Sequence, residues 1–297
     1  MNKPFYADFF GLKDHPFRLT PDTRYFFPSD KHIQILEILS YGVKNREGFM
    51  VLVGEPGTGK TMLLRLLLQS LPSEVETAVL LTTNLSPYEI IEAILEDLGL
   101  ELPYKSNKEI LWRIFRDYLL QLAAHGKRLL VVIDEAQNLS LETLEELRLL
   151  SNLEGEKDKL LQILLSGQPL LAHKLLSANL YQLFQRITIW EELKGLNREE
   201  ILTYVNYRLS KAGSSSVILD KRAIKYLHKY TKGFPRLINK IMDRSLLLMA
   251  AENQNILSPK ILKEALATFG PPSKSKFRNL FDKISLFYLH YACFLFG

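Results

Sequence analysis

Residues 49–61 read Phe49-Met50-Val51-Leu52-Val53-Gly54-Glu55-Pro56-Gly57-Thr58-Gly59-Lys60-Thr61, and this stretch decides the fold. Five apolar residues predict a buried strand, and the next eight match G-x-x-x-x-G-K-[ST], the Walker A phosphate-binding loop that opens a helix. Glycines let such a loop turn several N–H groups toward phosphates, and the helix N-terminus adds its positive dipole end. We therefore expect nucleotide contacts throughout residues 54–61, with Lys60 on the β- and γ-phosphates of ATP and Thr61 on Mg²⁺.

A second motif follows the apolar strand expected at residues 129–133, which ends in Asp134 and Glu135. Carboxylates in this position suit a Mg²⁺ site and a base that polarises water, so we expect Asp134 to help bind the metal and Glu135 to be the base. The strand expected at 160–165 ends in Ser166-Gly167-Gln168. One of Ser166 and Gln168 is expected to contact the γ-phosphate or the attacking water, and a plain polar loop explains either residue equally well.

Short apolar runs alternate with helical stretches between residues 49 and 190, a pattern typical of a parallel sheet covered by helices. Strands are expected at residues 49–53, 78–82, 129–133, 160–165 and 187–190. Ser86 with Glu89, and Ser106 with Glu109, are typical of helix starts. Helical periodicity then predicts helices at residues 197–212, 220–230, 235–253 and 258–269. The predicted fold is α/β, with a nucleotide-binding core (1–195), a small all-helical lid (196–270) and a linker with a short tail (271–297).

Two arginines are candidates for sensing the γ-phosphate. Arg186 precedes the strand at 187–190 and so lies at the sheet edge opposite its own phosphate loop, where it could act only as a finger in a neighbouring subunit of a ring or filament. A surface salt bridge is the competing interpretation. Arg236, in Gly233-Phe234-Pro235-Arg236, begins a lid helix and is expected to fold over the nucleotide. A solvent-facing arginine is the alternative, disfavoured by the positive end of the helix dipole.

The charge balance argues against a uniformly basic nucleic-acid-binding surface. The 297 residues include 38 Lys and Arg against 33 Asp and Glu, a net charge of +5. Four Lys or Arg residues and one acid, Asp282, follow residue 270 and contribute +3. The rest of the chain therefore carries a net charge of +2. The single cysteine, Cys293, excludes an internal disulfide, and the first ten residues lack the aliphatic run of a signal peptide. These features favour a cytoplasmic protein.

Taken together, the motifs resemble those of the AAA+ ATPases. They are GEPGTGKT (54–61), LLVVIDEAQNL (129–139), LLSGQP (164–169), QRI (185–187) and GFPR (233–236). The stretches at 9–32, 134–154 and 159–171 further resemble the general secretion pathway A ATPases and the related pilus-biogenesis ATPases, over roughly residues 5–269.

This resemblance implies an oligomeric, Mg²⁺-dependent ATPase that works with envelope secretion or pilus assembly proteins at the cytoplasmic face of the inner membrane. It implies that Gln168 is a sensor, Arg186 the finger and Arg236 the lid arginine. Members of the family continue through a membrane helix into a periplasmic peptidoglycan-binding part. Since this sequence stops at Gly297, we expect that part to be absent, which argues against a motor acting on peptidoglycan.

The tail suggests contact with a membrane surface. Residues 284–297 carry no formal charge, but as a helix they would extend only about 21 Å, less than a hydrocarbon core of about 30 Å. With Lys274, Lys276, Arg278 and Lys283 before it, the segment suits an interfacial anchor on anionic lipid. A helix packed on the lid or on a partner is the alternative.

A basic stripe in the lid leaves other functions open. Lys221, Lys225 and Lys229 share one face of the helix expected at 220–230. The stripe could hold DNA phosphates, as in a transposition-helper ATPase, although no base-reading motif accompanies it. It could instead meet an acidic helix of the next subunit, carrying Glu142, Glu145 and Glu146, or simply face solvent. A nucleotide-gated scaffold with slow turnover is a further alternative.

Overall fold

The computed structural model describes residues 3–81, 84–104, 106–153, 159–213 and 216–269, and the predicted tail at 271–297 lies outside them. The chain divides into two compact units. The first, the sheet unit, comprises residues 30–193. The second, the helical unit, combines the N-terminal residues up to Ser29 with the residues from Lys194 onward.

The sheet unit is built on five parallel strands in the order β2-β3-β4-β1-β5. The strands are β1 (Phe49–Gly54), β2 (Val75–Leu80), β3 (Arg128–Ile133), β4 (Leu161–Gly167) and β5 (Ile187–Leu193). Every residue of the three central strands β1, β3 and β4 is buried, as expected of a sheet covered on both faces. All five predicted strands are confirmed, although β2 begins three residues and ends two residues before its predicted bounds.

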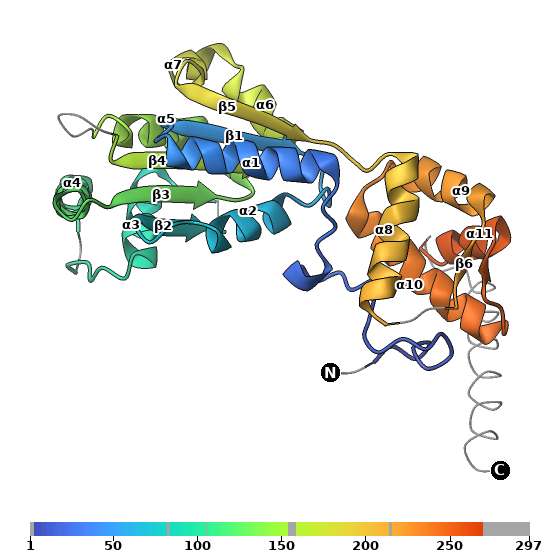
Figure 1. Cartoon of the computed structure of the whole chain (residues 1–297). Coiled ribbons are helices and arrows are strands. Elements are labelled where there is room, and N and C mark those ends of the chain that lie inside the picture. Colours follow the sequence, from blue (N-terminus) through green and yellow to red (C-terminus); the bar gives the residue numbers. More distant parts are fainter. Residues whose placement is uncertain (1–2, 82–83, 105, 154–158, 214–215, 270–297) are drawn as a thin grey trace. The chain divides into compact units, whose positions relative to one another are not determined.

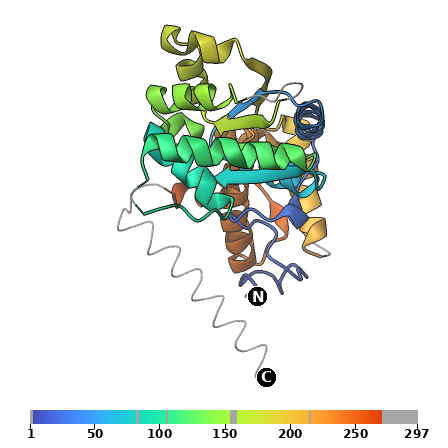
Figure 2. The ribbon, with the colours of Figure 1, turned by 90° about the vertical axis from the view of Figure 1, so that its left-hand side faces the viewer.

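Helices cover both faces of this sheet (Figure 1). On one face α1 and α2 pack against β5, β1 and β4, and on the other α3, α4, α5, α6 and α7 enclose the larger apolar core. Helix α4, seen end-on in Figure 1, lies lengthwise in Figure 2. The helices are α1 (Asp30–Lys44), α2 (Lys60–Gln69), α3 (Pro87–Asp97), α4 (Lys108–Ala124), α5 (Leu141–Leu150), α6 (Pro169–Leu175) and α7 (Tyr181–Phe184), with 3-10 turns at η2 (Ala136–Asn138) and η3 (Ala178–Leu180).

Two details of these helices bear on the sequence predictions. Ser86 and Glu89 form the predicted capping box of α3. Helix α4 is capped by Asn107 instead of Ser106, because the Asn107 side chain accepts the Ile110 N–H at 2.9 Å while the Ser106 hydroxyl donates to the Pro103 carbonyl.

The acidic face predicted for α5 is smaller than expected. Glu146 is only 4% exposed, and its carboxylate accepts hydrogen bonds from Lys108 Nζ at 2.6 Å and Trp112 Nε1 at 2.8 Å. Glu146 therefore joins α5 to α4 within the sheet unit and is not available to a neighbouring subunit, which leaves Glu142 and Glu145 on that face.

The helical unit contains the four predicted helices and a short parallel strand pair that the sequence did not predict. The helices are α8 (Arg198–Lys211), α9 (Lys221–Thr231), α10 (Pro235–Ala251) and α11 (Pro259–Ala267); the strands are β6 (Ile218–Leu219) and β7 (Ile256–Leu257). The N-terminal residues, expected in the nucleotide-binding core, lie in this unit because Tyr6, Phe10, Phe17 and Tyr25 are buried in its apolar cluster. A 3-10 turn, η1 (Thr23–Tyr25), ends this segment.

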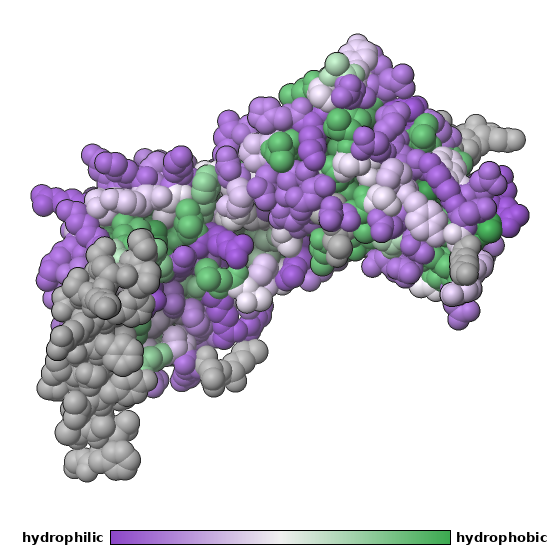
Figure 3. Space-filling view, turned by 180° about the vertical axis from the view of Figure 1, so that it is seen from behind, coloured by the Kyte–Doolittle hydropathy of each residue, from purple (hydrophilic) through white to green (hydrophobic). Residues whose placement is uncertain are grey.

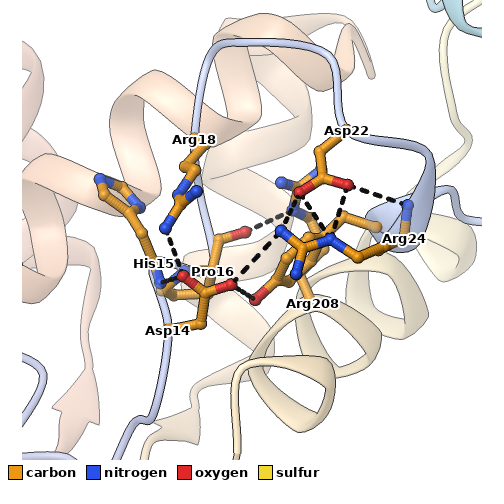
Figure 4. A network of polar contacts seen from close by, with 8 residues as sticks. Asp14, His15, Pro16, Arg18, Asp22, Arg24 and Arg208 are labelled. Carbon is orange, nitrogen blue, oxygen red and sulfur yellow. Dashed lines mark hydrogen bonds and ion pairs between the residues drawn. The ribbon is translucent and has the colours of Figure 1, made fainter. Parts of the chain in front are cut away.

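Arg208 of α8 fastens the N-terminal segment to the helices (Figure 4). The side chain is 6% exposed, and it donates from Nε to the Pro16 carbonyl at 2.5 Å and from Nη1 to the Tyr204 hydroxyl at 3.2 Å. Its guanidinium also lies 4.9 Å from the centre of the Tyr25 ring. On the same segment Asp14 and Asp22 pair with Arg18 and Arg24. Buried cations need such partners, so the segment and α8 depend on each other.

Two observations concern the surface. On the face shown in Figure 3, hydrophilic residues predominate and hydrophobic ones lie between them in patches. Among the residues that the structure describes, no helix has both the length and the apolar character needed to cross a membrane.

We predict that Arg208→Met lowers the free energy of unfolding by about 2 kcal/mol, because hydrogen bonds to a charged group contribute about that much and the Pro16 carbonyl loses its donor. Urea denaturation measures the change. Arg198→Met, at the exposed start of the same helix, is the control and should change stability by less than about 0.5 kcal/mol. Equal stability of the two variants would contradict the role of Arg208.

Candidate nucleotide-binding site

Residues 54–61, the predicted phosphate-binding loop (called the phosphate loop below), join β1 directly to α2. Gly59 has a φ of 115°, a backbone conformation that side chains strongly disfavour. Gly54 is required for a different reason: a Cβ there would lie 2.6 Å from the Leu193 carbonyl oxygen. The glycines therefore allow the loop to turn sharply while the end of β5 packs closely behind it.

Lys60 begins α2 with its side chain held along the loop. It is 5% exposed, and its Nζ donates to the Gly54 carbonyl at 2.7 Å and to the Glu55 carbonyl at 3.3 Å. Burial lowers the pKa of the ammonium group, and the carboxylates of Glu135, Asp134 and Glu55 only partly offset this effect. Lys60 is thus a desolvated cation that additional negative charge nearby would stabilise.

Asp134 joins three parts of the site. Its carboxylate accepts the Thr61 hydroxyl at 2.6 Å, the Ser166 hydroxyl at 2.8 Å and the Glu135 N–H at 3.0 Å. The register explains the contact with Ser166, because Ile133 pairs with Leu165 and the next residues therefore lie side by side. The Thr61 hydroxyl and the Asp134 carboxylate, which lie side by side, are hard oxygen ligands of the kind that Mg²⁺ prefers. Thr61 and Asp134 therefore fit the predicted metal.

Glu135 lies beside Asp134 in a left-handed conformation, with a φ of 54°. Its Oε2 accepts the side-chain amides of Gln137 at 2.7 Å and Gln168 at 3.0 Å. Burial raises the pKa of Glu135, but these hydrogen bonds and the Lys60 ammonium outweigh it and leave the pKa below its ordinary value. An ionised carboxylate beside Lys60 can accept a proton from water.

The two predicted arginines belong to different units of the chain. Arg186 directly precedes β5, at the amino end of the sheet and opposite the phosphate loop, and it donates to the Arg148 carbonyl at 3.2 Å and the Ser151 hydroxyl at 2.8 Å. Arg236 is exposed, one residue inside the start of α10 in the helical unit. The structure therefore brings together Lys60, Thr61, Asp134, Glu135 and Gln168, and it places Arg186 at the opposite edge of the same sheet.

Two contributors to the site, Gln137 and His32, were missed by sequence reasoning. Gln137 bonds Glu135 and also accepts the Gln168 N–H at 2.9 Å, so it organises the base and the expected sensor. Ser166, one of the two residues expected near the γ-phosphate or the water, donates its hydroxyl to the Asp134 carboxylate at 2.8 Å. His32 approaches the loop from α1, with Nε2 at 3.2 Å from the Thr58 carbonyl. Gln137 could have been found from its place two residues after Glu135, whereas His32 had no local signal.

Comparison with known proteins shows which families the chain resembles. Residues 43–176 match the AAA domain family. The chain is 41% identical over 250 residues to General secretion pathway protein A of Aeromonas hydrophila, an overlap of 84% of this chain and 46% of that protein. The chain thus spans about half the length of this curated relative. The predicted resemblance is confirmed.

Solved structures of the AAA+ class share the fold. The Aeropyrum pernix ORC2 protein, in ADPNP and ADP complexes, superposes with a TM-score of 0.61 at 16% identity, covering 84% of this chain and 72% of that one. Cdc6p from Pyrobaculum aerophilum gives 0.62 at 18% identity, with the same coverage. At this identity the likeness establishes the fold alone, and it confirms the predicted AAA+ sheet and helical unit.

Proposed function

We propose that the chain binds ATP with Mg²⁺ and hydrolyses it, on the premise that residues 43–176 match the AAA domain family. The observation that carries the proposal is the cluster of Lys60, Thr61, Asp134 and Glu135 at one edge of the sheet, where the Thr61 hydroxyl and the Asp134 carboxylate are hydrogen-bonded. Ligands bind at the carboxyl ends of the strands in open parallel sheets, and this cluster lies there.

Each residue has a distinct role in this proposal. The loop N–H groups and Lys60 bind the phosphates, and the buried ammonium gains a partner of higher charge than the carbonyls it now contacts. Mg²⁺, held by Thr61 and Asp134, would neutralise charge on the phosphate oxygens. Glu135 polarises a water molecule for attack on the γ-phosphorus, with ADP and inorganic phosphate as products. Gln168 orients Glu135 through its hydrogen bond and acts as the sensor.

We predict that Lys60→Ala abolishes ATP binding, whereas Glu135→Gln retains binding and stops turnover, because the lysine binds phosphate and the glutamate only polarises water. Titration with a fluorescent nucleotide and a phosphate-release assay separate the two effects. Equal ATP affinity in Lys60→Ala and wild type would refute the assignment of the phosphate loop.

Oligomerisation is part of the proposal. Arg186 lies at the sheet edge opposite the phosphate loop, so it could contact a nucleotide only in a neighbouring subunit of a ring or filament. Acting there, it would exchange its hydrogen bonds to Arg148 and Ser151 for phosphate oxygens. We propose Arg236, exposed at the start of α10, as the arginine of the lid.

We predict that Arg186→Ala has low ATPase activity that mixing with Lys60→Ala partly restores, because some intact phosphate loops then face intact arginines. Ser151→Ala is the matched control: it removes one of the two intrachain partners of Arg186 and should leave activity within about twofold. The absence of rescue at every mixing ratio, with oligomers verified by light scattering, would mean that Arg186 has only a structural role.

The cellular role is proposed from the relative. We propose an ATPase that works with envelope secretion or pilus assembly proteins, and the similarity to General secretion pathway protein A supports the secretion part. We propose a cytoplasmic location, peripheral to the inner membrane, with the basic and uncharged segments after residue 273 on anionic lipid.

For this anchor we predict that the full chain floats with anionic liposomes at low salt and that a chain ending at Gly270 does not, because the four basic residues and the uncharged segment are removed. Nucleotide binding by the shortened chain is the control for folding. Equal flotation of both chains would exclude the tail as the anchor.

DNA binding is a second candidate function, favoured by one observation. Lys221, Lys225 and Lys229 are exposed along α9 and could follow a phosphate backbone. Strong binding to duplex DNA that weakens steeply with salt would support this function. A nucleotide-gated scaffold would instead show ATP-dependent assembly with hardly any phosphate release.

A further inference from the structure

His32 lies in the first turn of α1, next to the phosphate loop. The residue is 5% exposed, although histidine is rarely buried this completely. Its Nε2 lies 3.2 Å from the Thr58 carbonyl oxygen, and Thr58 itself is fully buried. Because a carbonyl oxygen can only accept, this contact is a hydrogen bond only when His32 carries a proton on Nε2.

The orientation of one peptide group follows from this hydrogen bond. In a trans peptide the C=O and the N–H of the next residue point in opposite directions. The structure has no cis peptide bond among its described residues, so holding the Thr58 carbonyl toward His32 turns the Gly59 N–H to the other side of the loop. That side is where a phosphate-binding loop must present its N–H groups.

Packing places His32 where it can hold the loop. A Cβ on Gly59 would lie 3.0 Å from His32 Nε2 and 4.0 Å from Leu193 Cδ2, so these two side chains back the loop at its most strained residue. Gly59 has a φ of 115° and would otherwise have wide backbone freedom. The hydrogen bond from a rigid helix removes much of that freedom before any ligand arrives.

We propose that His32 is a positioning residue for the phosphate loop, which it holds in its phosphate-binding conformation by donating from Nε2–H to the Thr58 carbonyl. The inference rests on the proposed nucleotide binding. His32 touches no phosphate itself; it lowers the entropy that the loop loses when it closes around a ligand. Its effect therefore falls on affinity for nucleotides whose β-phosphate reaches the loop.

The test compares two substitutions of His32 with wild type in the full-length chain. His32→Phe keeps the ring volume and removes the donor, and His32→Gln keeps a donor at a similar reach. A fluorescent ADP analogue is titrated, and AMP, which lacks the β-phosphate, is measured by competition. We expect roughly tenfold weaker ADP binding in His32→Phe, the scale of one lost hydrogen bond, with AMP affinity changed less than about twofold and ADP binding largely restored in His32→Gln.

Ser40→Ala is the matched control, because it removes a hydrogen bond of the same helix, from the Ser40 hydroxyl to the Leu36 carbonyl, and does not touch the loop. It should bind ADP as wild type does. Wild-type ADP affinity in His32→Phe would overturn the inference while leaving the proposed function intact. Failure of the wild-type chain to bind ADP would instead overturn the proposed function, and the inference with it.

If His32→Phe does not fold, a measurement on the wild-type protein still tests the proposal. Imidazole ¹⁵N chemical shifts identify which ring nitrogen carries the proton, with the His32 signals assigned by comparison with His32→Gln. We expect a proton on Nε2. A neutral ring protonated on Nδ1 alone could not donate to Thr58 and would overturn the proposal.

Discussion

The Asp134 carboxylate is the constraint on which the site depends. It is 4% exposed, and the hydroxyls of Thr61 and Ser166 and the N–H of Glu135 all donate to it. A buried carboxylate is tolerated only when such donors surround it, so the start of α2 and the ends of β3 and β4 are held in register around one charge. The same arrangement leaves hard oxygen atoms together where a metal ion would be held.

The reactive groups around this carboxylate are already satisfied within the chain. Lys60 donates to the Gly54 carbonyl, and Glu135 accepts two side-chain amides, from Gln137 and Gln168. When a nucleotide binds, Lys60 exchanges its hydrogen bond to a neutral carbonyl for one to a charged phosphate. This exchange is favourable because hydrogen bonds between charged groups are stronger. A water molecule that donates a hydrogen bond to the Glu135 carboxylate must share this acceptor with the two amides. These exchanges couple binding to small rearrangements of the site.

The sequence predicted the parts of this protein that depend on local patterns. The phosphate loop and the carboxylates after β3 follow from short motifs beside buried strands. Strand β2 was misplaced because it lies at the sheet edge, where Glu76 and Thr77 are only partly buried. The long-range contacts could not be predicted, because packing between segments far apart in the chain decides them. Examples are the attachment of the N-terminal segment through Arg208 and the burial of Glu146 by Trp112.

The central claim is that this fold presents a working ATP and Mg²⁺ site, and calorimetric titration of the full-length wild-type chain with ATP tests it most directly. We expect one site per chain, with a Kd below about 1 mM that increases when a chelator removes Mg²⁺. A chain shown to be folded by circular dichroism that releases no heat with ATP, in either the presence or the absence of Mg²⁺, and that shows no displacement of a fluorescent nucleotide, would contradict it.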